Sequence, residues 1–218
     1  MPKPNDFQLG VVELFSILLP GALLVAALLM AFGLPSAFRD FLAPAGAHWV
    51  AFGLAAYAAG HLIFQLAAQL DDLFYDSYRK VAWPIDRDHA YQSATKLRLK
   101  ALPGQPGDSR DLPMNTFAWA KASLMLRAPA AYADVLRYEA DSKFFRSLVV
   151  VLPIVGILLG FRNMVIAMPI LAFLSCVCFF RYAERRYKST EWAYRYMIVL
   201  SSQTPDATPS KGLATDAD

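Results

Sequence analysis

Long apolar runs dominate the pattern of hydrophobic and polar positions along the chain. Four of them stand out, at 11–32, 48–70, 147–161 and 164–180. A helix needs about 20 apolar residues to cross the hydrocarbon core of a bilayer, and the first two runs reach that length. The third run is shorter, and it spans the core if Phe144 and Phe145 enter the membrane while Arg146 snorkels back to the surface. We therefore predict an all-α integral membrane fold with four transmembrane helices.

The first run is expected to stay in the protein as a span. It is longer than the apolar region of a signal peptide, Lys3 is accompanied by Asp6, and Glu13 interrupts its start. The third and fourth runs have an alternative, a tight hairpin that enters the bilayer only in part and thins it. Two full spans are the preferred interpretation.

The distribution of lysine and arginine predicts the orientation in the membrane. The segment 71–146 holds 12 of the 21 basic residues, and six more follow Phe180. Because basic loops stay inside the cell, this segment and both termini are expected on the cytoplasmic side of a bacterial or archaeal inner membrane.

The same pattern predicts the organisation of the chain. A helix should continue the second span as far as Pro84, another should cover 88–102, and Asn115 should cap a helix over 116–127. Pro129 suits the first turn of a helix that continues into the third span. The expected domains are a first transmembrane pair (1–70), a cytoplasmic helical segment (71–146), a second transmembrane pair (147–180), a cytoplasmic helix (181–203) and a disordered tail (204–218).

Composition agrees with a membrane protein and excludes several kinds of chemistry. The chain is 56% hydrophobic and 18% charged, whereas soluble domains are about 45–50% apolar and about 25% charged. A net charge of +3 is too small to indicate nucleic acid. No phosphate-binding glycine loop, metal-spaced His/Cys set or Ser/His/Asp grouping occurs, and Cys176 and Cys178 point to opposite helix faces. We therefore expect no cofactor, no metal and no catalytic residue.

Five polar residues share one face of the second span and its extension. At about 100° per residue they fall close together on the helix, and we call them the polar stripe: His61, Gln65, Gln69, Asp72 and Asp76. Polar groups in a membrane must face protein or water, so the stripe should point into a bundle or cavity. It would either line a path for an ion, proton or ligand, with His61 titrating, or bond neighbouring helices and fix the assembly.

The opposite face of this span carries the small residues Gly53, Ala56 and Gly60, which would let another helix approach closely. Glu13 lies at the depth of Gln65 and Gln69, so a contact with either one is a specific hypothesis. The candidate polar seam in the membrane therefore consists of Glu13, His61, Gln65 and Gln69. Alternatively, Glu13 lies at the membrane interface near Lys3.

An acidic cluster of Asp71, Asp72 and Asp76 follows the second span, and such clusters can hold Mg²⁺ against a lipid-linked diphosphate. No second acidic cluster completes the site, and the stretch lacks the glycine and arginine of the phosphotransfer signature. Asp76 also precedes Arg79 and Lys80 by three and four residues, which is an ordinary ion-pair spacing.

A basic run follows the fourth span and comprises Arg181, Arg185, Arg186 and Lys188. Basic residues beside a membrane attract anionic lipid headgroups, so membrane lipid is the expected partner. The aromatic residues between and after them are better explained by packing beside a membrane than by stacking on RNA.

The layout resembles small four-span proteins encoded beside bacterial and archaeal antiviral systems, including membrane accessories of some CRISPR loci. The stretches "ELFSILLPGALL" and "YAAGHLI" and the Arg/Tyr-rich helix after the fourth span carry this resemblance. It implies a homo-oligomer that alters membrane permeability when a cytosolic partner signals. The alternatives are a structural membrane adaptor without conduction and a Mg²⁺-dependent lipid-phosphate enzyme that uses Asp72 and Asp76.

Overall fold

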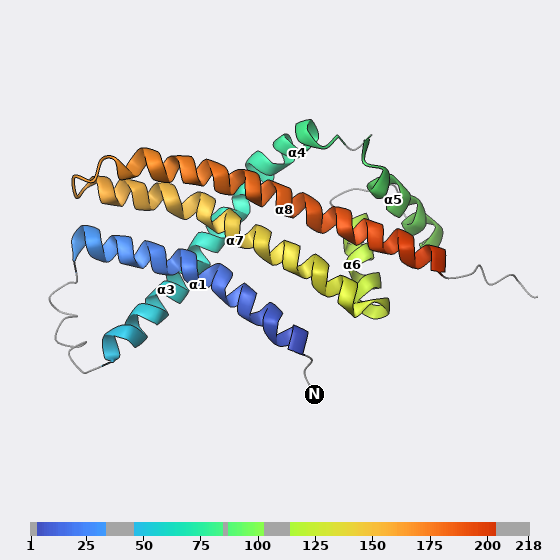
Figure 1. Ribbon diagram of the computed structural model, residues 1–218, viewed down its shortest axis with the longest axis horizontal. Helices are drawn as coiled ribbons and strands as arrows, with labels where there is room; N and C mark the ends of the chain where they lie inside the picture. Colours follow the sequence, from blue (N-terminus) through green and yellow to red (C-terminus); the bar gives the residue numbers. More distant parts are fainter. Residues whose placement is uncertain (1–3, 34–45, 85–86, 103–113, 204–218) are drawn as a thin grey trace, which may run out of the picture. The chain divides into compact units, whose positions relative to one another are not determined.

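Helices make up the regular secondary structure, and no strand occurs in the residues described by the structure, 4–33, 46–84, 87–102 and 114–203. The structure is a computed structural model. Its helices are α1 (Pro4–Phe32), α3 (Ala47–Leu70), η1 (Asp71–Tyr75), α4 (Asp76–Ala82), α5 (His89–Ala101), α6 (Thr116–Arg127), α7 (Pro129–Gly160) and α8 (Ala167–Gln203) (Figure 1). The chain divides into two compact units, residues 1–84 with 133–190 and residues 85–132 with 191–218.

Three helices are long and apolar enough to cross a membrane, whereas the sequence predicted four. They are Ala47–Ala82, Pro129–Gly160 and Ala167–Gln203, of 36, 32 and 37 residues. The first predicted span lies in α1, which contains the shorter apolar helix Ser16–Phe32. That stretch falls short of the roughly 20 residues that a span requires, so the prediction of four spans is confirmed for three of them.

The helices continue beyond the apolar runs as predicted. The second run extends through η1 and α4 to Ala82, just before Pro84, and Pro129 begins a helix that continues through the third run. Asn115 caps α6, since its Oδ1 accepts a hydrogen bond of 2.9 Å from the backbone N–H of Ala118. The predicted tail over 204–218 lies outside the described residues.

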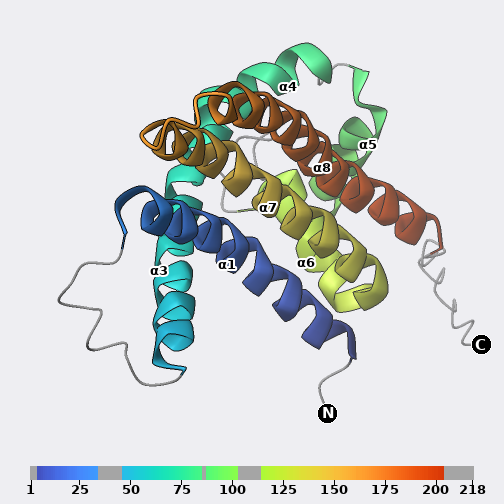
Figure 2. The same ribbon diagram turned by 60° about the vertical axis from the view of Figure 1, so that its left-hand side comes forward.

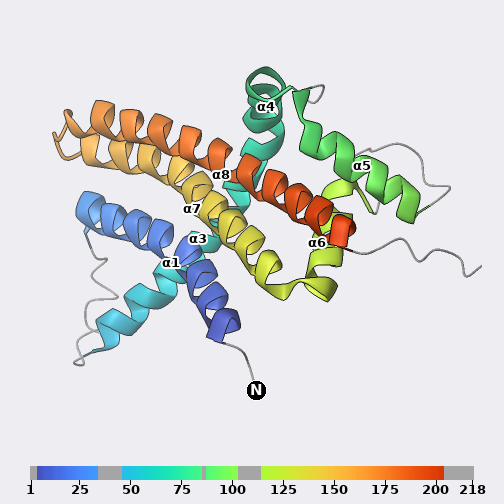
Figure 3. The ribbon, with the colours of Figure 1, turned by 45° about the vertical axis from the view of Figure 1, so that its right-hand side comes forward.

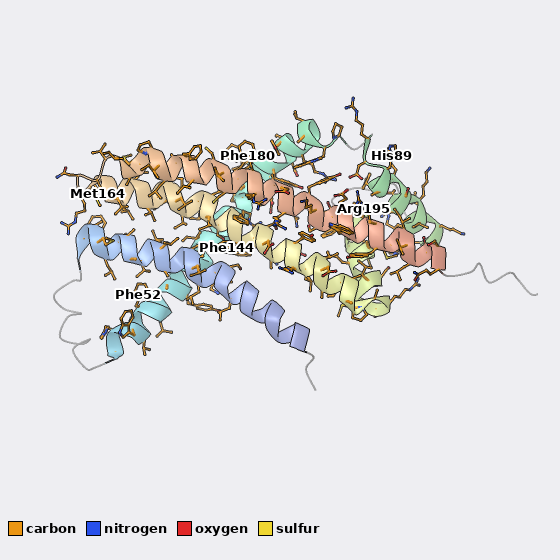
Figure 4. The ribbon with its side chains drawn as sticks, in the orientation of Figure 1. Phe52, His89, Phe144, Met164, Phe180 and Arg195 are labelled. Carbon is orange, nitrogen blue, oxygen red and sulfur yellow. The ribbon has the colours of Figure 1, made fainter. Side chains whose placement is uncertain are left out.

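In the first unit, α7 and α8 form an antiparallel hairpin, and Met164 lies at its turn (Figure 4). Asn163 adopts a positive φ of 61° there, a conformation that asparagine tolerates better than most residues. α1 lies along the hairpin and α3 crosses α1 (Figure 2). The core where these helices meet is formed by Ala27, Ile63, Val151, Val155 and Leu158.

The crossing of α1 and α3 depends on two glycines. A Cβ atom on Gly60 would overlap the carbonyl oxygen of Ile17 and lie 2.9 Å from its Cγ2. A Cβ atom on Gly21 would overlap the carbonyl oxygen of Ala56. The two backbones therefore touch directly, and the predicted small-residue face of α3 does allow a close approach. Gly53 does not take part, because a Cβ there would meet nothing within 4 Å.

In the second unit, Arg98 of α5 is fully buried and holds the start of α6. Its Nη1 donates a 2.8 Å hydrogen bond to the carbonyl of Met114. Asp88 caps α5 by accepting from the N–H of Tyr91 at 3.0 Å. This unit is thus organised by polar contacts to helix ends as well as by apolar packing.

Candidate functional site

The part of the polar stripe that belongs to α3 lies on the outside of the chain. His61, Gln65 and Gln69 are all exposed, whereas the buried residues of α3 are Ala56, Gly60, Ile63 and Ala67. Within a single chain these side chains face away from the buried side of α3, and the expectation that the stripe points into a bundle or cavity stays a prediction. The small residues face α1 because they permit its close approach, and this turns the larger polar side chains outward.

His61 makes one local contact on this outer face. Its ring meets Tyr57, one turn earlier, edge to face, with 4.5 Å between ring centroids. Glu13, the fourth member of the candidate seam, has a side chain outside the described part of α1. Its contact with Gln65 or Gln69 thus stays a prediction.

The three carboxylates of the acidic cluster differ in how far they are buried. Asp71 is the first residue of η1, a π-helical turn, and it points toward α7 and α8. Arg146 Nη1 donates a 2.5 Å hydrogen bond to Asp71 Oδ2, and the Tyr182 hydroxyl donates to Asp71 Oδ1. Asp72 is exposed and Asp76 is half-buried. One member of the predicted cluster is thus engaged in an ion pair.

That Arg146 reaches the membrane surface stays a prediction. Within the protein the residue is only 8% exposed and lies between helices. Its charge is paired with Asp71, and it stacks over the Phe64 ring at 5.1 Å from the centroid. A buried charge without such a partner would cost several kcal/mol, so the carboxylate determines where the side chain goes.

An aromatic cluster surrounds the ion pair. The Tyr75 and Tyr182 rings lie 5.6 Å apart, and both residues are almost fully buried. Trp83 stacks on Tyr187 with 4.5 Å between ring centroids and an interplanar angle of 4°. The end of α3, the extension through η1 and α4, α7 and α8 are therefore joined by charge, hydrogen bonds and ring packing. We call Asp71, Arg146 and Tyr182 the polar clamp.

Most of the basic run contacts acidic side chains of the same unit. Arg181 and Lys188 both bond Glu184, at 2.9 and 2.6 Å, and the hydrogen bond from Lys188 is the main cause of the lowered pKa of that carboxyl. Arg185 lies 3.8 Å from Asp141 and over the ring of Tyr138. Arg186 is half-buried. The expected contact of the basic run with lipid headgroups remains a prediction. Lipid phosphates would compete with Glu184 and Asp141 for these basic side chains.

The polar clamp was not predicted, although the sequence holds a signal for it. Asp71 and Arg146 both stand at the inner end of an apolar run, so opposite charges occupy the same predicted depth. Charges at that depth are expected to pair. At 100° per residue Asp71 also falls within about 40° of the buried residues Gly60 and Ala67, so the helical pattern indicated its direction.

In the described part of the chain, no three His, Cys, Asp or Glu residues gather closely enough to hold a metal ion. Comparison with protein-family models, curated proteins and solved structures finds no match to this chain. The candidate site is therefore defined by its own geometry: an exposed polar helix face and a buried polar clamp at one end of the same helix.

Proposed function

We propose that this chain is a multi-pass inner-membrane protein that works as an assembly of copies and receives a cytosolic partner or signal. The observation that carries the proposal is the position of His61, Gln65 and Gln69 on the exposed face of an otherwise apolar helix. Side chains that form hydrogen bonds are costly against lipid, so this face needs protein or water beside it. In the proposed arrangement α1 forms the fourth span.

The orientation and the regulatory part of the proposal come from the sequence. The basic segment 71–146 and the end of α8 would lie in the cytoplasm and receive the partner. The resemblance to membrane proteins of antiviral systems supports altered membrane permeability as the response. In that function the three membrane residues of the polar stripe would border the polar path.

A structural adaptor is the second candidate, and the direct backbone contact of α1 with α3 favours it. Gly21 and Gly60 leave no gap between these helices, which suits a rigid scaffold. The lipid-phosphate enzyme has less support, because Asp71 is engaged by Arg146 and Tyr182.

Replacing both His61 and Gln65 with leucine tests the permeability function. We expect overproduced wild-type protein to depolarise cells that carry a potential-sensitive dye, and the double variant to lose this effect, because leucine removes the polar groups that border the path. Native mass spectrometry of both proteins controls for assembly. Equal depolarisation by an assembled variant would refute the polar path, and no depolarisation by either protein would favour the adaptor.

A further inference from the structure

The outward face of α3 carries two parallel rows of side chains with the same spacing. One row is polar, with His61, Gln65 and Gln69 four residues apart. The row beside it is apolar and includes Leu62 and Leu66, which are 69% and 59% exposed. Helices whose side chains repeat every four residues can pack together by interdigitating those rows. Figure 3 shows that α3 diverges from α1 on either side of their crossing, so α1 covers only part of its length.

Lipid is a poor neighbour for the polar row. Each glutamine amide brings two N–H donors and a carbonyl acceptor, none of which acyl chains can satisfy. The row from His61 to Gln69 covers about 12 Å of helix, a large part of one leaflet. Because these polar side chains repeat along one face, we expect a partner helix that runs beside α3 over several turns.

We infer that this partner is α3 of a second copy of the chain, packed in parallel against the row of His61, Gln65 and Gln69. Copies inserted in the same orientation place the same residues at the same depth, so Gln65 meets Gln65 and Gln69 meets Gln69. The amide of glutamine carries both donors and acceptors and therefore pairs with itself reciprocally. Neutral side chains avoid the repulsion that two identical charged faces would suffer. The inference rests on the proposed assembly of copies and identifies the surface that forms it.

Cysteine cross-linking in native membranes tests this contact. In a background with Cys176→Ser and Cys178→Ser, we expect Gln65→Cys to form a disulfide-linked dimer on oxidation. Phe173→Cys is the control, since Phe173 is 68% exposed in the apolar part of α8 and is not placed at the contact. Equal cross-linking at both positions would indicate random collision and would overturn the inference.

Native mass spectrometry separates failure of the inference from failure of the proposed function. An oligomer that does not cross-link through Gln65→Cys would overturn the α3 contact and leave the assembly standing. A monomer would overturn both. As a second measurement, Gln65→Leu combined with Gln69→Leu should weaken association about tenfold, because hydrogen bonds between helices stabilise their pairing in membranes. Unchanged association of this more apolar variant would also contradict the inference.

Discussion

Gly60→Ala is expected to destabilise the protein by about 3 kcal/mol or more, because the added methyl group overlaps the backbone of α1. The nearest atom is the carbonyl oxygen of Ile17, which cannot rotate away as a flexible side chain could. Overpacking of this kind typically costs about 1–3 kcal/mol, and relief here requires the two helices to separate. The thermal midpoint in detergent should fall by roughly 6–12 °C.

Gly53→Ala provides a matched control on the same helix. A Cβ atom at Gly53 meets nothing within 4 Å, and alanine is the better helix former by about 1 kcal/mol. This variant should be as stable as the wild-type protein or slightly more stable. If both variants behave alike, direct contact of the α1 and α3 backbones does not hold this unit together. Gly21→Ala should reproduce the loss, since its methyl group would overlap the carbonyl of Ala56 on the other helix.

The sequence predicts most of the helices because their signals are local. Apolar runs, Pro84 and Pro129 as boundaries, and Asn115 as a cap each act within a few residues, and the structure has helices where they indicate. The first span is the exception: α1 (Pro4–Phe32) is helical over the whole predicted run, but its apolar stretch Ser16–Phe32 is shorter than a span requires.

The buried face of each helix was harder to predict, because it depends on contacts between segments that are distant in the sequence. On α3 the exposed residues His61, Gln65 and Gln69 lie away from the buried Ala56 and Gly60. Sequence alone could not decide which of the two another helix of the chain would cover. Gly60 settles the question, because only the small face lets α1 approach to backbone contact.

The acidic cluster shows a second limit of periodicity. A π-helical turn contains more residues than an α-helical turn, so beyond Asp71 the faces no longer follow 100° per residue. Asp71 itself precedes this shift: at 100° per residue it continues the buried face of Gly60 and Ala67, and there it reaches Arg146, which is 75 positions away in the sequence. Such turns are frequent at functional sites, and this one includes Asp72 of the polar stripe.

Asp71→Ala should be among the most damaging single substitutions in the chain. It leaves Arg146 buried without its counter-charge and Tyr182 without an acceptor, and breaking a buried pair from one side costs about 3–5 kcal/mol. Glu184→Gln is the control, because the pairs of Glu184 with Arg181 and Lys188 are more exposed than the pair of Asp71 with Arg146. Surface pairs contribute about 0–1 kcal/mol, so its thermal midpoint should barely change.

A double-mutant cycle distinguishes a coupled clamp from two independently important residues. If the loss in Asp71→Ala comes from the uncompensated charge, adding Arg146→Met should recover much of it, because an apolar pair of similar volume can replace a buried ion pair. Tyr182→Phe in the same background should recover a further part, by removing a hydroxyl that no longer has an acceptor. Additive losses instead would mean that Asp71 and Arg146 stabilise the fold separately. The extension through η1 and α4 would then not be tied to α7 and α8 through this pair, and a signal received there would need another route to the polar stripe.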